Sequence, residues 1–243
     1  MTYRKYSNLC LLAWFVAAFT VIFRLDSSES KAAQSAKRYV EEGWKPLFNG
    51  KDLSGWEQKG GKAVYRVENR EIVGTAVPKT GNSFLCTQRS YTNFVLELEF
   101  KVINGLNSGV QVRSQCFDEP TTFTNSDKVV KIPAGRVHGY QIEIDPSARA
   151  WTGGIYEEGR RGWLNNLKDN EAARLAYRSN DWNHFRIEAT GDHLRTRLNG
   201  VSAGDLKDSL NQSGFLGLQV HGIGTRTNLM EVRFREVWLR EMP

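Results

Sequence analysis

The chain has 243 residues, a formal net charge of +6 and 25% charged residues. This length suits one sizeable domain with a substantial buried core better than two small domains. A basic protein can bind nucleic acid or an acidic polymer, but the Lys and Arg residues are dispersed and no recognised nucleic-acid motif accompanies them, so we expect no nucleic-acid partner.

The N-terminal segment has the organisation of a targeting signal. Two basic residues precede an uncharged, largely apolar run that ends at Phe23. This order is typical of a secretory signal peptide or an uncleaved membrane anchor, which we place at residues 1–25. Residues 26–43 are rich in Ser, Ala, Glu and Lys and predict a polar tether, and residues 44–243 predict the folded domain. We therefore expect an exported protein that is periplasmic, extracellular or held at a membrane by its N-terminal segment.

The rest of the chain predicts an all-β sandwich or barrel. Short stretches of alternating apolar and polar residues recur between turns rich in Gly, Asn and Asp. Helical periodicity is weak except around residues 168–177. Near the C-terminus the apolar parity changes, which a β-bulge near Arg235 would reconcile. The expected strands are 64–73, 83–87, 93–103, 109–114, 140–145, 184–189, 194–198, 215–221 and 232–239.

The most informative stretch is GYQIEID at residues 139–145, in which apolar and polar side chains alternate strictly. Successive side chains of a β-strand point to opposite faces. The Tyr and the two Ile would therefore enter the core, while Gln141, Glu143 and Asp145 share the other face. The residues on that second face are of the types that form a binding or catalytic surface.

Two other expected strands have polar faces of the same kind. Gln111 and Arg113 alternate with valines, and Gln219 and His221 alternate with apolar residues further along the chain. An ordinary solvated sheet face explains any one such strand. Amides, carboxylates and Arg together, however, suit the hydroxyl groups of a sugar. We expect six of these side chains to line one concave cleft: Gln141, Glu143, Asp145, Arg113, Gln219 and His221.

Motifs of other enzyme classes are missing from the sequence. It has no GxSxG elbow and no phosphate-binding glycine loop, which argues against a serine hydrolase and against a nucleotide-dependent enzyme. It also has no CxxC and no His-Glu-x-x-His, so a zinc site is unsupported. Beyond the N-terminal segment only Cys86 and Cys116 remain, and they fit one disulfide or two isolated thiols equally well.

A series of short motifs resembles the 3-keto-disaccharide hydrolase domain family from about Trp44 to Met242. In chain order the motifs are WKPLFNGKDLSGW at 44–56, NSG at 107–109 with Arg113 after it, GYQIEID at 139–145, TGGIY at 152–156, DWN at 181–183, LNG at 198–200 and LQVH at 218–221.

This resemblance implies a concanavalin-like jelly-roll β-sandwich of two antiparallel sheets and the cleavage of glycosides that already carry a ketone at C3. The candidate catalytic residues are Glu143, Asp145, Arg113 and His221. The candidate substrate-binding residues are Gln141, Gln111, Asn107, Tyr156, Gln219 and Trp182, although Trp182 with its neighbouring Asn is more typical of a buried aromatic anchor and strand-entry turn. An insertion-like loop at residues 117–136 would reshape one end of the cleft.

The chemistry that the resemblance implies starts at the ketone. A C3 ketone acidifies the proton on C2, so a base can remove it, the enolate expels the substituent at C1, and water then adds to the alkene. Glu143 or Asp145 is the expected base, Arg113 the stabiliser of the enolate, and His221 or Tyr156 the proton donor. A divalent metal held by the carboxylates and the histidine is an alternative to Arg113.

Two other functions fit the same fold. A lectin-like carbohydrate-binding module would use the amides with stacking Trp and Tyr, and would need no base. A conventional retaining glycosidase would need two carboxyl groups about 5 Å apart. The segment that begins at Glu143 starts like the Glu-x-Asp-x-x-Glu strand of laminarinase-like enzymes, but it continues Pro146-Ser147-Ala148 and lacks the second Glu.

Overall fold

The computed structural model describes residues 39–125 and 128–243. The predicted signal or anchor at residues 1–25 and most of the predicted tether lie outside the described residues. The chain divides at Lys45 into two units, and the second, Pro46–Pro243, carries the fold. Of the helices that the structure describes, none has the length and apolar character needed to cross a membrane.

The first large sheet, sheet A, is antiparallel. Its strand order is β15-β14-β13-β6-β17-β4-β3. The strands are β15 (Val201–Lys207), β14 (His193–Leu198), β13 (Asn183–Thr190), β6 (Phe94–Ile103), β17 (Glu231–Glu241), β4 (Glu71–Thr75) and β3 (Val64–Glu68); the two-residue strand β1 (Lys45–Pro46) lies at the division between the units.

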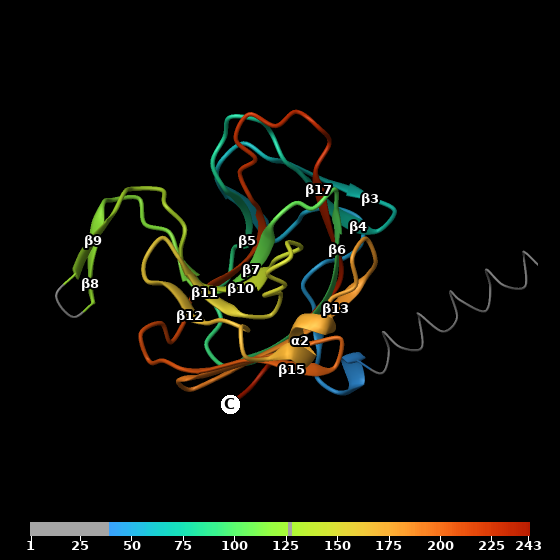
Figure 1. Cartoon of the computed structure of the whole chain (residues 1–243). Helices are drawn as coiled ribbons and strands as arrows, with labels where there is room; N and C mark the ends of the chain where they lie inside the picture. Colours follow the sequence, from blue (N-terminus) through green and yellow to red (C-terminus); the bar gives the residue numbers. More distant parts are fainter. Residues whose placement is uncertain (1–38, 126–127) are drawn as a thin grey trace, which may run out of the picture. The chain divides into compact units, whose positions relative to one another are not determined.

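The second large sheet, sheet B, is also antiparallel and has the order β12-β11-β10-β7-β16-β5-β2. In Figure 1 its strands β5, β7 and β10 lie to the left of β6, β13 and β17 of sheet A. The strands are β12 (Gly162–Asn165), β11 (Ile155–Glu158), β10 (His138–Ile144), β7 (Ser108–Gln115), β16 (Phe215–Val220), β5 (Ser83–Thr87) and β2 (Trp56–Gly60).

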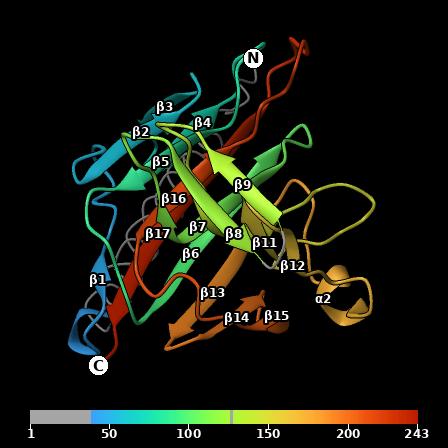
Figure 2. The same ribbon diagram turned by 90° about the vertical axis from the view of Figure 1, so that its left-hand side faces the viewer.

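A two-stranded arm stands out from the sandwich. It consists of β8 (Thr121–Asn125) and β9 (Lys128–Ile132), which pair only with each other among the described strands. Figure 2 shows this arm in front of sheet B, on the side away from sheet A. The arm is the loop that the sequence predicts as an insertion at residues 117–136.

The core between the two sheets follows from the alternation of the strands. Tyr140, Ile142 and Ile144 of β10 are fully buried, as are Phe100 of β6 and Phe185 of β13, whose ring centroids are 4.6 Å apart. Because each strand gives its apolar parity to the core, the polar parity of sheet B faces away from sheet A. This arrangement is the predicted jelly-roll β-sandwich.

Several local expectations also hold. The register between β17 and β6 shifts between Arg235 and Trp238, and Glu236 there has a φ of +49°, so the predicted C-terminal bulge is confirmed. The expected strand 64–73 is two strands joined by a turn at Asn69 and Arg70. The weak helical pattern yields the short helix α2 (Glu171–Leu175). The sequence pattern missed β1, β2, β8, β9, β11, β12 and β15.

Candidate functional site

A chain of side-chain amides on the outward face of sheet B ends at Glu143. The Nε2 atoms of Gln111 and Gln219 both donate to Oε1 of Gln141, at 2.5 and 2.9 Å. Gln141 Nε2 in turn donates to Glu143 Oε2 at 2.8 Å, and Asn107 Nδ2 donates to Glu143 Oε1 at 2.7 Å. Because Gln141 Oε1 is occupied by two donors, its NH₂ group must face the carboxylate. Every hydrogen bond in this amide chain therefore points its donor toward Glu143.

A glycine makes room for the amide chain. Gly109 on β7 is the Cα partner of Glu143 on β10, and a Cβ built at Gly109 would come within 2.6 Å of the Gln141 side chain. Since that contact is shorter than real Cβ contacts, the glycine lets the amide of Gln141 lie against the sheet. The glycine of the NSG motif thus positions the group that donates to the carboxylate.

Burial makes Glu143 a stronger base than an exposed glutamate. The residue is only 5% exposed, and burial raises the pKa of its carboxyl group, against the lowering effect of the hydrogen bonds from Asn107 and Gln141. The donors hold the carboxylate in one orientation while its proton affinity stays above the usual value. This combination is suited to removing a proton from a bound molecule.

Strand β11 supplies the wall next to Glu143. Tyr156 is the Cα partner of Gln141, so it lies on the same face, and Glu158 follows two positions later. Glu158 is only 6% exposed and accepts a 2.6 Å hydrogen bond from Arg136. Burial raises the pKa of Glu158, while Arg136 and His221 lower it.

Other polar groups of this cleft come from the β16 side of sheet B. His221 is half-buried directly after β16, and its Nδ1 lies 2.8 Å from the carbonyl oxygen of Gly222. A carbonyl only accepts, so Nδ1 carries the proton and Nε2 is the nitrogen left for other partners. Gln219 Oε1 is buried and has no hydrogen-bond partner among the described residues. Because Gln219 is fully buried, this oxygen lies beneath the surface of the cleft and a ligand does not contact it.

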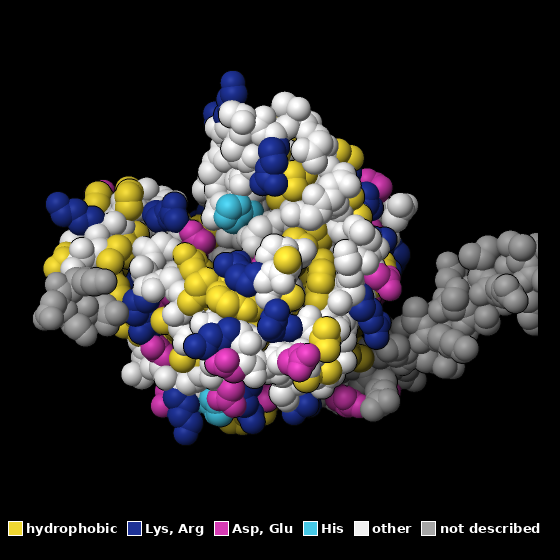
Figure 3. Space-filling model, viewed as in Figure 1, with side chains coloured by type: hydrophobic (Ala, Val, Ile, Leu, Met, Phe, Trp, Pro, Cys, Tyr) yellow, Lys and Arg dark blue, Asp and Glu magenta, His cyan; other side chains and the backbone are white. Residues whose placement is uncertain are grey.

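Three aromatic rings form a wall beside the carboxylate. The Trp163 ring contacts Tyr156 edge-on, with centroids 5.3 Å apart, and Trp151 at 4.8 Å. The Arg149 guanidinium lies 4.7 Å above the Trp151 ring. Partly exposed aromatic rings of this kind offer apolar faces to a sugar ring. Figure 3 shows hydrophobic and basic side chains together where Figure 1 places β11 and β12, beside a hollow with His, acidic and basic side chains at its rim.

The structure thus brings together most, but not all, of the sequence-predicted residues. The cleft holds Glu143, Gln141, Gln111, Asn107, Gln219, Tyr156 and His221. It also holds Trp151, Trp163, Glu158 and Arg136, which the sequence reasoning missed. The available signals were the aromatic residues on both sides of the TGGIY motif.

The expectation that Arg113 lines the cleft is wrong. A β-bulge on β7 places Arg113 and Ser114 opposite the single residue Gly139, and Arg113 has a φ of +46°. Its fully buried side chain instead donates to the carbonyl oxygens of Thr92 at 2.7 Å and Gly191 at 2.6 Å. Arg113 therefore ties loops together and does not face the carboxylate.

Asp145 has a different task from the one expected of a base. Its oxygens accept hydrogen bonds from the Ser147 amide at 3.1 Å and from Arg149 Nε at 2.8 Å. Burial alone would raise its pKa, but these hydrogen bonds outweigh burial and the pKa is lowered. Asp145 holds the loop that leads to Trp151, and it also accepts a hydrogen bond from the Trp151 backbone amide at 3.3 Å.

Trp182 is not in the cleft either. It directly precedes β13 of sheet A, and its ring lies 3.9 Å from the Arg235 guanidinium. Arg235 in turn donates to Glu99 of β6 at 2.6 Å. Its role is structural, as its sequence context favours, but the residue lies on the other sheet and is partly exposed instead of buried.

The residues described offer little for a metal or a disulfide. Among residues 39–125 and 128–243, no group of three or more His, Cys, Asp or Glu side chains is placed to hold a metal ion. Cys86 and Cys116 are both free thiols. The amide chain of the cleft carries one carboxylate, which suits hydroxyl groups better than a divalent cation.

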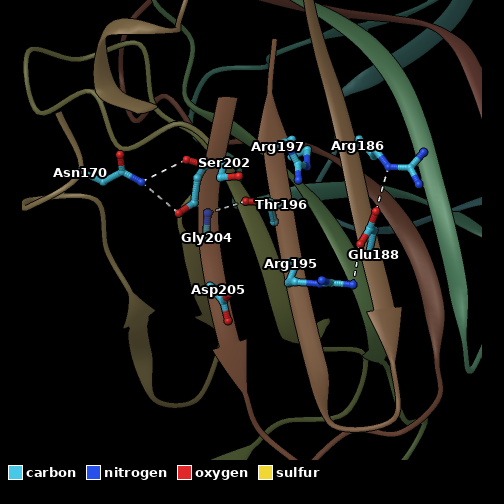
Figure 4. Close-up of a pocket in the computed structure, with 10 residues that line it drawn as sticks. Asn170, Arg186, Glu188, Arg195, Thr196, Arg197, Ser202, Gly204 and Asp205 are labelled. Carbon is cyan, nitrogen blue, oxygen red and sulfur yellow. Dashed lines mark hydrogen bonds and ion pairs between the residues drawn. The ribbon is translucent and has the colours of Figure 1, made fainter. Parts of the chain in front are cut away.

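A second hollow, of about 280 Å³, lies on sheet A and its edge strand β15. Figure 4 shows Arg186 and Arg195 pointing toward Glu188 from its two sides. Glu188 lies 2.8 Å from each guanidinium, so its charge is already matched. Because Glu188 is held between two guanidinium groups, it is a poor base, and the cleft on sheet B is the better candidate site.

Comparison with known proteins agrees with the geometry. A family model described as the 3-keto-alpha-glucoside-1,2-lyase-like domain matches residues 43–240. The chain belongs to this family. No match was found among curated proteins.

Solved structures similar to this member of the 3-keto-alpha-glucoside-1,2-lyase-like family share its fold. Two are from Parabacteroides distasonis, and their names give a provisional glycosyl hydrolase assignment. The first is 18% identical, with a TM-score of 0.54, covering 85% of this chain and 97% of its own. The second is 23% identical, with a TM-score of 0.52, covering 82% and 99%. A Bacillus subtilis protein of unknown function with a galectin-like fold is 10% identical, with a TM-score of 0.54, covering 82% and 94%.

Replacing Arg113 should affect stability and not chemistry. We expect Arg113→Met to lower the free energy of unfolding by about 1–3 kcal/mol, because the fully buried Arg113 side chain no longer donates hydrogen bonds to the carbonyl oxygens of Thr92 and Gly191. Urea denaturation measures this loss. The control Arg197→Met, at an exposed position of sheet A, should change stability by less than about 0.5 kcal/mol. Equal stability of the two variants would contradict the role given to Arg113.

Proposed function

We propose that this domain cleaves glycosides that carry a ketone at C3, with Glu143 as the base that removes the proton from C2. The observation that carries the proposal is the buried carboxylate of Glu143, held by the NH₂ groups of Asn107 and Gln141 at 2.7 and 2.8 Å. The family match and the provisional hydrolase names of similar structures support a carbohydrate substrate. The sequence left the base open between Glu143 and Asp145. We assign it to Glu143, because the oxygens of Asp145 accept hydrogen bonds from the loop that follows it.

The reaction proceeds in two stages. Glu143 accepts the C2 proton, electrons move toward the C3 ketone, and the enolate that results expels the C1 substituent to leave a C1=C2 alkene. Water then adds across this alkene, with its oxygen to C1 and a proton returned to C2. Tyr156 and His221 remain the expected proton donors of the cleft, and the free hydrogen of the Asn107 NH₂ group is a neutral donor for substrate oxygen atoms.

The aromatic wall gives the substrate a place to stack. A pyranose ring that lies against Tyr156 and Trp163 would present its polar edge to the amide chain. Binding of the sugar and removal of its proton thereby use adjacent parts of one surface.

A carbohydrate-binding module without catalysis is the second candidate. Both oxygens of Glu143 already accept hydrogen bonds, and amides with aromatic rings bind hydroxyl groups without any reaction. A module of this kind would bind oxidised and unoxidised sugars and turn over neither. A conventional glycosidase would cleave the unoxidised glycoside.

Selectivity for the ketone tests the proposed chemistry. We expect the protein to cleave a 3-keto-glucoside far faster than the corresponding glucoside, because only the ketone makes the C2 proton removable by a carboxylate. Product formation by chromatography measures the two rates. Deuterium at C2 should slow the reaction or exchange with solvent. Equal rates on both sugars, with neither an isotope effect nor exchange at C2, would exclude the elimination.

Replacing the base should separate catalysis from folding. Glu143→Gln is expected to lower kcat by about 10²–10⁴-fold, since it removes the proton acceptor. The variant should keep a cooperative unfolding transition, because Gln removes a buried charge, keeps the shape of the side chain and keeps one acceptor oxygen for the two donor groups. The hydrogen bond lost at its NH₂ group should lower stability without abolishing folding. The control Glu57→Gln, at an exposed position on β2, should keep wild-type activity. Retained turnover in Glu143→Gln would assign the base elsewhere.

The pH profile offers an independent test of the same residue. The ionised form of Glu143 is the active form, so kcat/KM should rise with pH as its carboxyl group loses a proton. Since burial raises this pKa, the midpoint of the rise should lie above the ordinary value of 4.5. A midpoint at or below 4.5 would show that the titrating group is not the buried carboxyl.

We also propose that the domain is exported, because a basic start, an apolar run and a polar tether occur in that order within residues 1–43. Mass spectrometry of natively expressed protein should find a shortened N-terminus, or fractionation should find the full chain in the membrane. A cytosolic chain that keeps Met1 would contradict export.

A further inference from the structure

Arg149 is a cation at the edge of the cleft, and the mechanism above does not use it. Its side chain is 42% exposed, and its Nε donates to Asp145 Oδ2 at 2.8 Å. The two terminal NH₂ groups of the guanidinium, at Nη1 and Nη2, have no hydrogen-bond partner among the residues that the structure describes. These two groups are therefore left to donate to a bound molecule.

The guanidinium of Arg149 is held in one orientation. Its carbon lies 4.7 Å from the centroid of the Trp151 ring and 5.1 Å from that of the Trp163 ring. Asp145, which binds its Nε, is itself fixed by hydrogen bonds from the backbone amides of Ser147 and Trp151. A charged hydrogen bond and two cation–π contacts restrain a side chain that would otherwise sample many rotamers. The donors are therefore in place before a substrate binds.

The same contacts place the guanidinium close to Glu143. The Glu143 amide donates to the carbonyl oxygen of Gly154 at 2.9 Å, so Gly154 is the neighbour of Glu143 on the β11 side. A Cβ built at Gly154 would lie 3.1 Å from the Trp163 ring, so this ring covers Gly154. Arg149 contacts that ring and therefore lies near the carboxylate. The pKa of Glu143 agrees with this position, because the charge of Arg149 acts to lower it, against the larger effect of burial.

The separation of the two groups suits neighbouring atoms of one sugar ring. Asp145, which binds Arg149, lies two positions from Glu143, or about 7 Å along the strand. In the substrate only one atom, C3, separates C2 from the ketone oxygen. A base about 3–3.5 Å from C2 and a donor about 3 Å from the ketone oxygen are themselves several ångströms apart. Glu143 and Arg149 can therefore reach these two substrate atoms at the same time.

We propose that Arg149 is a catalytic residue that donates to the C3 oxygen and stabilises the enolate. This inference rests on the proposed function. As Glu143 takes the C2 proton, the C–H electron pair forms a C2=C3 bond, and the electrons of the C3=O double bond move to oxygen. The NH₂ groups of Arg149 bind the negative oxygen and transfer no proton, because a guanidinium stays protonated.

The second half of the elimination returns these electrons. The C2=C3 pair forms the C1=C2 bond, the C3 ketone is restored, and the C1–O electron pair leaves with the substituent oxygen. That oxygen takes its proton from Tyr156 or His221, the donors named above. Arg149 thus acts only on the oxygen whose charge rises and falls. The stabilising role that the sequence assigned to Arg113 passes to an arginine on the loop after β10, with Asp145 as its positioning residue.

Enolate formation can be measured apart from cleavage. The probe is 3-keto-1,5-anhydroglucitol, which carries the C3 ketone but has hydrogen at C1 and so has no group to expel. NMR in deuterated water follows the exchange of its C2 proton. We expect Arg149→Met to lower this exchange rate, and kcat on a 3-keto-glucoside, by about 10²–10³-fold. KM should change by less than about threefold, because the charge on oxygen develops only in the transition state.

Three further variants serve as controls. Glu143→Gln should abolish the exchange at C2, and Arg197→Met, at an exposed position of sheet A, should leave it unchanged. Arg149→Lys keeps a positive donor without the planar fork, so it should exchange at least about tenfold faster than Arg149→Met. Equal loss in the Lys and Met variants, with wild-type unfolding in urea, would assign Arg149 a structural role and overturn the inference.

The outcomes separate this inference from the proposed function. A wild-type protein that neither cleaves the 3-keto-glucoside nor exchanges C2 of the probe overturns both. A wild-type protein that does both, with an Arg149→Met variant that exchanges C2 at the wild-type rate, overturns the role of Arg149 alone. Binding of a sugar acid that is lost in Arg149→Met, while exchange of the neutral probe is unchanged, would also overturn it, because Arg149 would then recognise an anionic substrate.

Discussion

A carboxylate removed from water must find its hydrogen-bond donors within the protein, and Glu143 finds them in side-chain amides. The orientation of the Gln141 amide is fixed, because its oxygen accepts hydrogen bonds from Gln111 and Gln219. Only its NH₂ group is therefore left to donate to Glu143. Three strands of sheet B must keep their register for this chain to form. The position of the carboxylate is therefore a property of the whole sheet, and the glycine at position 109 is one condition for it.

The other charged groups differ in how far their neighbours already satisfy them. Arg113 and Asp145 have their hydrogen-bonding capacity used by carbonyl groups and by a loop, so they hold the ends of the cleft in place. Glu158 has one strong partner, Arg136, and a raised pKa. The same residue types thus serve different ends, and what separates them is whether neighbouring atoms already satisfy them.

Strict alternation is what made much of this site predictable from the sequence. Gln141, Glu143 and Gln219 lie on the expected face because β10 and β16 are regular there. The prediction failed at Arg113, where a bulge inserts a residue and reverses the parity, and nothing in the local sequence announces this bulge. Trp182 was named from the family resemblance and not from alternation, and its sequence context already favoured the structural role that it has on sheet A.

The sequence pattern did not predict Glu158 as a site residue, because the core-facing position next to it in β11 is also polar. In β11 the inward position is Glu157, which is fully buried and accepts two hydrogen bonds from the guanidinium group of Arg161, at 2.6 and 2.9 Å. With carboxylates facing both sides, β11 lacks the alternation of apolar and polar residues that identifies a half-buried strand. The sequence pattern therefore predicted no strand there. The ion pair that stabilises this position is formed across a turn and becomes visible only in three dimensions.

The most direct test of the account is a crystal structure of the Glu143→Gln variant with an uncleaved 3-keto-glucoside bound. The account predicts that the sugar lies in the sheet B cleft with its C2 atom about 3–3.5 Å from the side chain at position 143, in a geometry ready for proton transfer. A sugar bound in this cleft with C2 turned away from position 143, or bound only in the hollow on sheet A, would contradict the assignment of Glu143 as the base.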